Sequence, residues 1–252
     1  MKEPSRKPEF SDPRQKVIFA LDVSTLEEAR KFVDLLKDRT GMFKVGLELY
    51  SAWGPQAVKA VLEKGGRVFL DLEFLDIPNT VSRAAEEAVR LGVEMFNIHA
   101  TGGREMMQET VDRTHKMAER LNRPRPIILA VTILTSLDEQ NLKEVGLLGT
   151  VEERVVHLAE LARRAGVDGV VASPQEIQPI RQRCGPGFII VTPGIRPAFA
   201  PLGKDDQKRV MTAREALAAG ADYLVIGRPV RLAQDPVAAM DRVLDEIHPE
   251  EK

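Results

Sequence analysis

Cysteine is almost absent from this chain, which contains only Cys184 among its 252 residues. A single cysteine excludes an intrachain disulfide and a cysteine-rich metal site, and low cysteine use is typical of proteins from a reducing compartment. We therefore expect a cytoplasmic protein that is held together by its hydrophobic core. Hydrophobic residues make up 43% of the chain, which is enough to build one sizeable core.

An excess of positive charge is also missing. Lysine and arginine number 36 against 38 aspartate and glutamate residues, and the net charge is −2. Proteins that bind nucleic acid or membrane surfaces generally carry a basic excess, so neither partner is expected. No apolar run is long enough to span a membrane, and residues 1–14 lack the apolar stretch of a signal peptide. We expect residues 1–14 and 248–252 to be flexible tails around one domain of residues 15–247.

What the chain does contain is a regular alternation of short apolar runs with longer segments of helical spacing. The apolar runs, which are rich in strand-forming residues, are Val17–Leu21, Phe43–Leu47, Val68–Leu72, Met95–His99, Ile127–Val131, Gly169–Ala172, Ile189–Val191 and Tyr223–Ile226. The clearest helical segments are Thr25–Lys37, Ala57–Lys64, Thr80–Leu91, Arg104–Leu121, Val151–Ala165 and Thr212–Ala219. Thr212 with Glu215, and Ser24 or Thr25 with Glu28, have the pattern of helix N-caps. Strands that alternate with helices predict βαβ units and a parallel sheet.

Eight such units predict a single-domain (β/α)8 barrel, the TIM-barrel fold of the α/β class, and the length of the chain is typical of that fold. The predicted strands are apolar throughout rather than alternating, as expected when both faces of a sheet are covered. The rival fold is an open doubly wound sheet that binds a dinucleotide. That sheet would carry Gly-x-Gly-x-x-Gly after its first strand, and the motif is missing here.

Polar or otherwise distinctive residues lie in or directly after nearly every predicted strand. They are Asp22, Lys44, Asp71, Glu73, Asp76, Asn97, His99, Thr132, Thr135, Ser136, Ser173, Thr192, Gly227 and Arg228. In a barrel the C-terminal ends of the strands surround the active site, so these residues converge on one face. Asn97 and His99 are interpreted as packing groups of the barrel interior, and Asp22 taken by itself is more typical of the cap before Thr25 than of a site.

The densest group of ionisable residues follows the third predicted strand. Asp71, Glu73 and Asp76 lie there among apolar neighbours, and Lys44 lies on the preceding strand. A lysine inside an apolar strand is costly unless it is paired. Grouped carboxylates beside a lysine shift one another's pKa values, which is typical of functional sites. The sequence therefore predicts that the chemistry centres on residues 71–76.

A phosphate site is predicted after the last two strands. Gly227 and Arg228 follow the eighth strand, and Arg196 lies in the Gly- and Pro-containing loop after the seventh. Barrels often bind phosphate in these two loops, where glycine admits the anion and arginine offers two parallel hydrogen bonds. The loop of residues 195–210 is predicted to be a flexible lid, from which Gln207 would reach the phosphate or the base.

Residues 71–80, with the sequence Asp-Leu-Glu-Phe-Leu-Asp-Ile-Pro-Asn-Thr, closely resemble the signature of the orotidine 5'-phosphate decarboxylase family. The resemblance extends to residues 44–46, 131–136, 192–197, 206–209 and 227–229, and it covers the chain from Lys16 to about Ile247. It implies a cofactor-free decarboxylation of orotidine 5'-phosphate to UMP in pyrimidine biosynthesis. It also implies a homodimer with its sites at the subunit interface.

The resemblance assigns roles to individual residues, with Lys44, Asp71, Glu73 and Asp76 at the catalytic positions. Asp22 and Lys44 would hold the ribose, Thr135 and Ser136 would contact the pyrimidine, and Arg196, Gln207, Gly227 and Arg228 would surround the phosphate. Asp76 and Thr80 would reach into the site of the neighbouring subunit. The further expected substrate contacts are Ile77, Asn79 and Pro193.

One residue departs from the family's catalytic pattern, which is Asp-x-Lys-x-x-Asp. This chain has Glu73 in place of the lysine. In the family, the lysine ammonium stabilises the carbanion left at C6 of the pyrimidine when CO2 departs, and it then delivers the proton. A glutamate cannot supply that cation. We predict that Glu73 is partly protonated or paired with Lys44, because three carboxylates in one pocket cannot all ionise cheaply.

Three functions remain open from the sequence. The first is a decarboxylase of lowered activity, and the second is a protein that binds UMP-like ligands without turnover. Both would need no metal or cofactor. The third is a metal-dependent sugar-phosphate decarboxylase or aldolase that holds Mg²⁺ through Asp71, Glu73 and Asp76. The third is the least favoured, because such relatives resemble this chain less in residues 76–80 and in the loop after the seventh strand.

Overall fold

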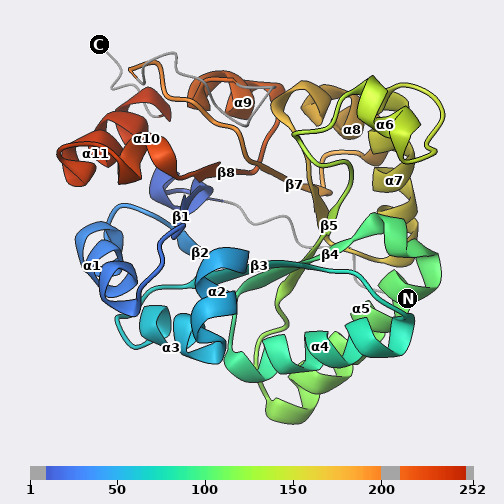
Figure 1. The fold of residues 1–252 in the computed structure, drawn as a ribbon, viewed down its shortest axis with the longest axis horizontal. Coiled ribbons are helices and arrows are strands. Elements are labelled where there is room, and N and C mark those ends of the chain that lie inside the picture. Colours follow the sequence, from blue (N-terminus) through green and yellow to red (C-terminus); the bar gives the residue numbers. More distant parts are fainter. Residues whose placement is uncertain (1–9, 200–210, 248–252) are drawn as a thin grey trace.

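Eight parallel strands close into a barrel in the order of the sequence, with β1 paired to both β2 and β8 (Figure 1). The structure is a computed structural model and describes residues 10–199 and 211–247. The strands are β1 (Val17–Ala20), β2 (Met42–Gly46), β3 (Val68–Phe74), β4 (Met95–His99), β5 (Ile127–Val131), β6 (Gly169–Val171), β7 (Ile189–Thr192) and β8 (Tyr223–Ile226). The predicted (β/α)8 barrel is therefore confirmed.

Helices form the outer layer and connect the strands (Figure 1). They are α1 (Leu26–Leu36), α2 (Leu47–Trp53), α3 (Pro55–Leu62), α4 (Pro78–Leu91), α5 (Gly103–Leu121), α6 (Glu139–Glu144), α7 (Val151–Ala165), α8 (Ile177–Cys184), α9 (Ala213–Ala219), α10 (Arg228–Arg231) and α11 (Pro236–Ile247). Short 3-10 turns at Pro13–Lys16, Ala100–Gly102 and Pro174–Glu176 complete the connections. Within the described ranges, no helix is long and apolar enough to cross a membrane.

The helix boundaries follow from local chemistry. Thr25 begins α1 by accepting a hydrogen bond from the backbone N–H of Glu28, and Thr212 forms a reciprocal capping box with Glu215 at the start of α9. These side chains satisfy N–H groups that have no partner inside the helix. Gly92 ends α4 in the left-handed conformation, which costs glycine little. Both predicted N-caps are confirmed.

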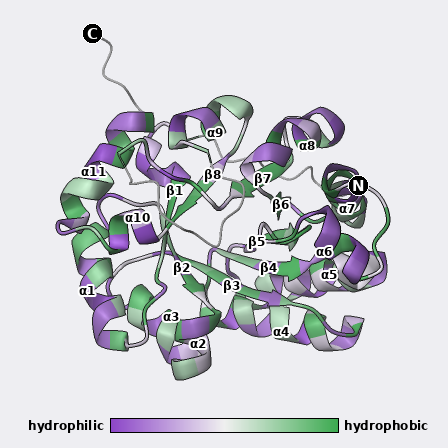
Figure 2. Ribbon diagram, turned by 45° about the horizontal axis from the view of Figure 1, so that its top comes forward, coloured by the Kyte–Doolittle hydropathy of each residue, from purple (hydrophilic) through white to green (hydrophobic). Residues whose placement is uncertain are grey.

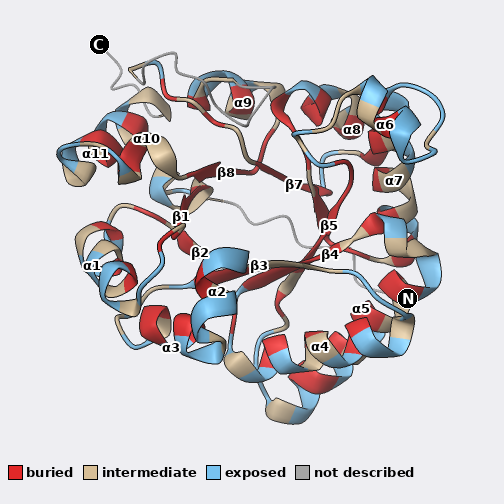
Figure 3. Cartoon of the chain, viewed as in Figure 1, coloured by how far each residue is buried: buried red, intermediate tan, exposed pale blue. Residues whose placement is uncertain are grey.

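The core has two layers, one inside the barrel and one between the barrel and its helices. The barrel interior contains Ile18, Met42, Phe69, Met95, Leu129, Ile189 and Tyr223, and the rings of Phe10 and Tyr223 pack in a T-shaped arrangement with centroids 5.1 Å apart. The outer layer pairs the other face of each strand with the apolar side of a helix. The strands are accordingly hydrophobic in Figure 2 and buried in Figure 3, whereas the helices are exposed along their outer sides. Burial on both faces keeps the C-terminal strand ends in fixed positions.

Candidate active site

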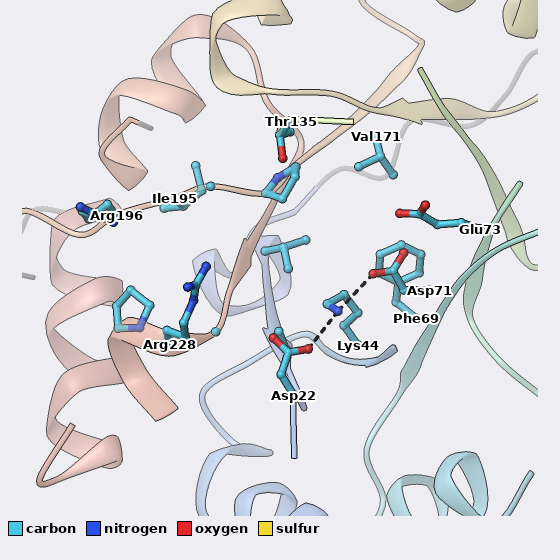
Figure 4. Close-up of a pocket in the computed structure, with 16 residues that line it drawn as sticks. Asp22, Lys44, Phe69, Asp71, Glu73, Thr135, Val171, Ile195, Arg196 and Arg228 are labelled. Atoms are coloured by element: carbon cyan, nitrogen blue, oxygen red, sulfur yellow. Dashed lines mark hydrogen bonds and ion pairs between the residues drawn. The ribbon is translucent and has the colours of Figure 1, made fainter. Parts of the chain in front are cut away.

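A pocket of about 250 Å³ opens at the C-terminal end of the barrel (Figure 4). Twelve of the sixteen residues that line it were predicted for this face or lie in the predicted loops, and the remaining four are small or apolar. The lining consists of Ala20, Asp22, Lys44, Phe69, Asp71, Glu73, Thr135, Val171, Pro193, Gly194, Ile195, Arg196, Val225, Gly227, Arg228 and Pro229. Strands β1, β2, β3, β6 and β8 and the loops after β5, β7 and β8 thus all contribute to one pocket.

Lys44 forms the centre of a chain of charges on one side of the pocket. Its Nζ lies 3.2 Å from Asp22 Oδ1 and 3.1 Å from Asp71 Oδ2, and only 14% of its side chain is exposed (Figure 4). Burial alone would lower the pKa of Lys44, but Coulombic attraction and hydrogen bonds from Asp71 and Asp22 outweigh it and leave that pKa raised. Lys44 is therefore a fixed cation between two carboxylates. This confirms the prediction that a lysine inside an apolar strand must be paired.

The backbone of β3 is distorted where it reaches the pocket. Its pairing with β4 shifts register between Leu70 and Phe74, and Glu73 has a φ of 52°. That left-handed conformation is unfavourable for a residue with a Cβ and costs about 1–2 kcal/mol. Asp71 and Glu73 both line the pocket, on the same side of β3 as Phe69, because side chains two residues apart on a strand share a face.

Asn97, on β4, holds this distorted segment in place. Its side-chain oxygen accepts a hydrogen bond of 2.9 Å from the backbone N–H of Glu73, and its Nδ2 donates one of 2.5 Å to Asp71 Oδ1. Asn97 is fully buried. The acceptor oxygen and the donor nitrogen of the Asn97 amide thus both bind the same segment of β3. Asn97 therefore fixes the Asp71 carboxylate relative to the backbone of residue 73.

The side chain of Glu73 pairs with His99 rather than with Lys44. Glu73 Oε2 lies 3.0 Å from His99 Nε2, while Lys44 is engaged by the two aspartates. The predicted Glu73–Lys44 pair is therefore wrong. His99, interpreted from the sequence as a packing group, instead contacts a residue of the pocket. His99 is the last residue of β4, the strand that pairs with β3.

The opposite end of the pocket carries two arginines. Arg196 follows β7 and Arg228 begins α10, and Figure 4 shows both well separated from Asp71 and Glu73. Between them and Lys44, the backbone of Gly227 approaches the neighbouring strand closely. A Cβ at residue 227 would lie 3.2 Å from the Cβ of Ala20 and 3.4 Å from Asp22 Oδ2. Glycine thus keeps this end of the pocket open, beside two guanidinium groups suited to an anion.

Several predicted site residues lie elsewhere. Asp76, Ile77, Asn79 and Thr80 are exposed at the start of α4, where Asp76 Oδ1 accepts the N–H of Ile77 at 2.6 Å, and none of the four lines the pocket. Ser136 also lies outside the lining, although Thr135 is in it.

Gln207 falls outside the described residues. Over residues 10–199 and 211–247, no three His, Cys, Asp or Glu side chains are grouped as a metal site, so Asp71, Glu73 and Asp76 do not form the predicted Mg²⁺ alternative.

Sequence reasoning did not identify the apolar walls of the pocket. Phe69, Val171 and Val225 belong to the barrel interior and line the pocket from below the charged residues. Each is an inward-facing position of a strand, so the alternation along β3, β6 and β8 contains the signal that would have identified them. These walls give the pocket one apolar surface against which a flat ring can pack.

Comparison with known proteins gives a consistent result over nearly the whole chain. Residues 15–243 match the model of the family described as orotidine 5'-phosphate decarboxylase / HUMPS. The chain is 58% identical over 234 residues to an orotidine 5'-phosphate decarboxylase of Geobacter sulfurreducens, covering 93% of this chain and 96% of the relative. It is 57% identical over 235 residues to the protein of that name from Moorella thermoacetica, covering 93% and 92%.

The fold is similar to solved structures of the same kind. A crystal structure of orotidine 5'-phosphate decarboxylase from Lactobacillus acidophilus superposes with a TM-score of 0.81 at 35% sequence identity. The match covers 92% of this chain and 98% of the solved one. Fold and family therefore agree.

Proposed function

Because this chain belongs to the orotidine 5'-phosphate decarboxylase / HUMPS family, we propose that its pocket binds orotidine 5'-phosphate and UMP and that its reaction is loss of CO2 from the former. The observation that carries the proposal is the division of the pocket into two ends. One end holds the chain Asp22–Lys44–Asp71, and the other holds Arg196 and Arg228. A nucleoside monophosphate has the matching division, with a dianionic phosphate at one end and the sugar and ring toward the other.

Each part of the substrate has a corresponding group in the pocket. Arg196, Arg228 and the backbone at Gly227 would bind the phosphate, and Lys44 with Asp22 would hold the ribose hydroxyls. The pyrimidine would pack near Thr135 and the apolar wall. Its C6 carboxylate would then lie toward Asp71 and Glu73, the side where CO2 is lost. A fixed Asp71 carboxylate would repel the substrate carboxylate, and loss of neutral CO2 transfers that negative charge to C6 of the ring until a proton is added there.

The activity of this chain depends on Glu73. By resemblance, residue 73 occupies the position of the lysine that stabilises and protonates the C6 carbanion. Here its side chain is a carboxyl group 3.0 Å from His99, and Lys44 is held by Asp22 and Asp71. We propose decarboxylation at a strongly lowered rate, on a pocket that binds its ligands.

A second candidate function is ligand binding without turnover. The Glu73–His99 pair favours it, because this pair places a carboxyl group rather than an ammonium at the reacting end of the pocket. One experiment separates the two candidates. The consumption of orotidine 5'-phosphate is followed by absorbance, with and without EDTA, while UMP binding is measured by calorimetry. Binding with measurable turnover supports the first candidate and binding without it the second. Absence of UMP binding, or activity lost on chelation, would contradict both.

We further propose that the chain forms a homodimer through the rim of the pocket that lies after β2 and β3. Large apolar side chains are exposed there on two neighbouring segments: Leu47 at 58% and Trp53 at 42% on α2, and Leu75 at 54% and Ile77 at 66% before α4. Apolar groups collected beside a polar pocket are typical of an interface. Asp76 and Thr80 lie on the same segment, which supports a role for them in the neighbouring subunit's site.

The oligomeric state is measured by sedimentation velocity, with Ile77→Glu as the disrupting variant. Leu232→Glu is the control, because Leu232 is equally exposed, at 68%, but follows β8 on another part of the rim. A dimer that only Ile77→Glu dissociates is expected. A monomeric parent protein, or a dimer unaffected by Ile77→Glu, would contradict the proposed interface.

A further inference from the structure

We propose that Glu246, near the end of the C-terminal helix α11, is a positioning residue for the arginine end of the pocket. The inference rests on the proposed role of Arg196 in phosphate binding. Glu246 does not line the pocket. It acts through the backbone of the connection between β7 and α9, which carries Arg196.

The carboxylate of Glu246 binds both ends of that connection at once. Its Oε2 accepts a hydrogen bond of 3.0 Å from the backbone N–H of Ala198, two residues after Arg196. Its Oε1 accepts one of 2.9 Å from Ala213 and a longer one of 3.4 Å from Arg214, which are the first two residues of α9. One side chain therefore joins two segments that are 15 residues apart in sequence (198 to 213), and it also supplies negative charge to the N-terminus of α9.

A second contact from α11 supports the first. The guanidinium carbon of Arg242 lies 4.0 Å from the centroid of the Phe199 ring. Arg242 and Glu246 are four residues apart and so project from the same side of α11. Helix α11 thus holds Ala198 by a hydrogen bond and Phe199 by a cation–π contact. It packs in turn on α9 and α10, which follow β7 and β8 (Figure 1).

The position of Arg196 depends on this clamp through its own backbone. Ile195 and Met211 form a parallel bridge, and the N–H of Arg196 donates a hydrogen bond of 3.0 Å to the carbonyl of Met211. Met211 immediately precedes Thr212, the N-cap of α9. Glu246 contacts Ala198, which follows Ile195 and Arg196, and Ala213, which follows Met211. If Glu246 is removed, the segments on both sides of the Ile195–Met211 bridge lose a contact. A phosphate-binding arginine that must be ordered on binding binds less tightly than one already in position.

The predicted consequence is a loss of affinity confined to ligands that carry a phosphate. We expect Glu246→Ala to weaken UMP binding about tenfold and to leave uridine binding unchanged. Gln has only one acceptor oxygen, so Glu246→Gln can keep either Ala198 or the start of α9 and is expected to lie between the two. Asp245→Ala is the matched control, because Asp245 is an exposed carboxylate on the adjacent residue of the same helix.

The experiment measures UMP and uridine affinities of the full chain and these three variants by calorimetry and ligand-observed NMR. It also measures amide hydrogen exchange without ligand at residues 195, 196, 198, 199 and 211–214, the positions around Pro197 and α9 that carry a backbone N–H. A selective loss for UMP and faster exchange in Glu246→Ala alone support the inference. Unchanged UMP affinity, an equal loss of UMP and uridine, or the same effects in Asp245→Ala would overturn it. If the parent protein fails to bind UMP, the proposed function is refuted. The exchange measurement still decides whether Glu246 holds the connection.

Discussion

Replacing Glu73 by lysine is expected to raise the rate of orotidine 5'-phosphate decarboxylation by several orders of magnitude. The reaction leaves negative charge on a ring carbon. At present the side chain at residue 73 is a carboxyl group, 32% exposed and bound to His99. Lysine would place an ammonium there, able both to stabilise the carbanion and to protonate it.

The size of the effect follows from the charges involved. Two unit charges about 4 Å apart interact by roughly 4 kcal/mol at an effective dielectric constant near 20. Exchanging a negative for a positive group changes that energy by about 8 kcal/mol, or about six orders of magnitude in rate at about 1.4 kcal/mol for each tenfold step. Since a third of the Glu73 side chain is exposed, screening lowers the figure. A dielectric constant near 40 leaves about 4 kcal/mol, so the expected range is about three to six orders of magnitude.

The fold should tolerate this change. The backbone N–H of residue 73 remains bound to Asn97, and its left-handed conformation strains lysine as much as glutamate. The His99 contact is lost, but His99 is itself 15% exposed and can be solvated. We therefore expect a change of less than about 1 kcal/mol in the free energy of unfolding.

The assay compares the parent chain with Glu73→Lys and Glu73→Gln at equal concentration, again with and without EDTA. Glu73→Gln removes the negative charge without adding a positive one, so it should recover only about half of the gain on a logarithmic scale. If the parent chain turns over as fast as Glu73→Lys, our account of residue 73 is refuted. An equal gain in Glu73→Gln would show that loss of repulsion, and not the ammonium, accounts for the rate.

Three further predictions concern charge and burial. Lys44→Met, which leaves Asp22 and Asp71 without their cation, should lower the free energy of unfolding by about 3 kcal/mol in urea titrations. The control Lys64→Met removes a lysine that is paired with Asp34 but is 37% exposed, and it should cost less than about 1 kcal/mol. The Lys44 contribution is complete below the ordinary lysine pKa and is lost as pH rises through its raised folded pKa, so the difference between parent and variant should stay constant from about pH 6 to 9. Burial raises the pKa of the Cys184 thiol, so Ellman's reagent should label it slowly at pH 8 in the native protein and quickly in urea; fast native labelling would contradict that burial. Asp76→Ala should weaken UMP binding although Asp76 is exposed in its own chain, whereas unchanged affinity would show that one subunit completes the site.

The fold could be predicted from the sequence because its signals are local and repeated. Predicted and observed bounds coincide for β4, β5, β8 and α7 and differ by a few residues in the other predicted elements. Helices α2, α6, α8, α10 and α11 are not among the predicted segments. The apolar run of β2 was extended to Leu47, which in fact begins α2 and is exposed. A pattern of hydrophobic residues does not distinguish an exposed leucine from a buried one, so the end of the strand could not be placed from it.

The site was predictable in composition but not in detail. Convergence of strand ends placed Asp22, Lys44, Asp71, Glu73, Arg196 and Arg228 on one face, and all six line the pocket. The register shift in β3 has no signature in the sequence, because glutamate does not favour a positive φ. The sequence therefore did not indicate that Glu73 pairs with His99, or that Asp76 lies outside the pocket.

The contact that holds residue 73 does not involve its side chain. Asn97 binds the backbone N–H of that residue and the carboxylate of Asp71, so the same geometry is available to any side chain that accepts the left-handed conformation. Exchanging the side chain of residue 73 therefore changes the charge at this end of the pocket without changing the backbone contact that holds residue 73 in place. For this reason a chain 58% identical to an orotidine 5'-phosphate decarboxylase can keep the fold and the arginine end of the pocket with a carboxyl group at residue 73. It also follows that removing Asn97 should impair ligand binding whichever residue occupies position 73, because the position of Asp71 depends on it directly.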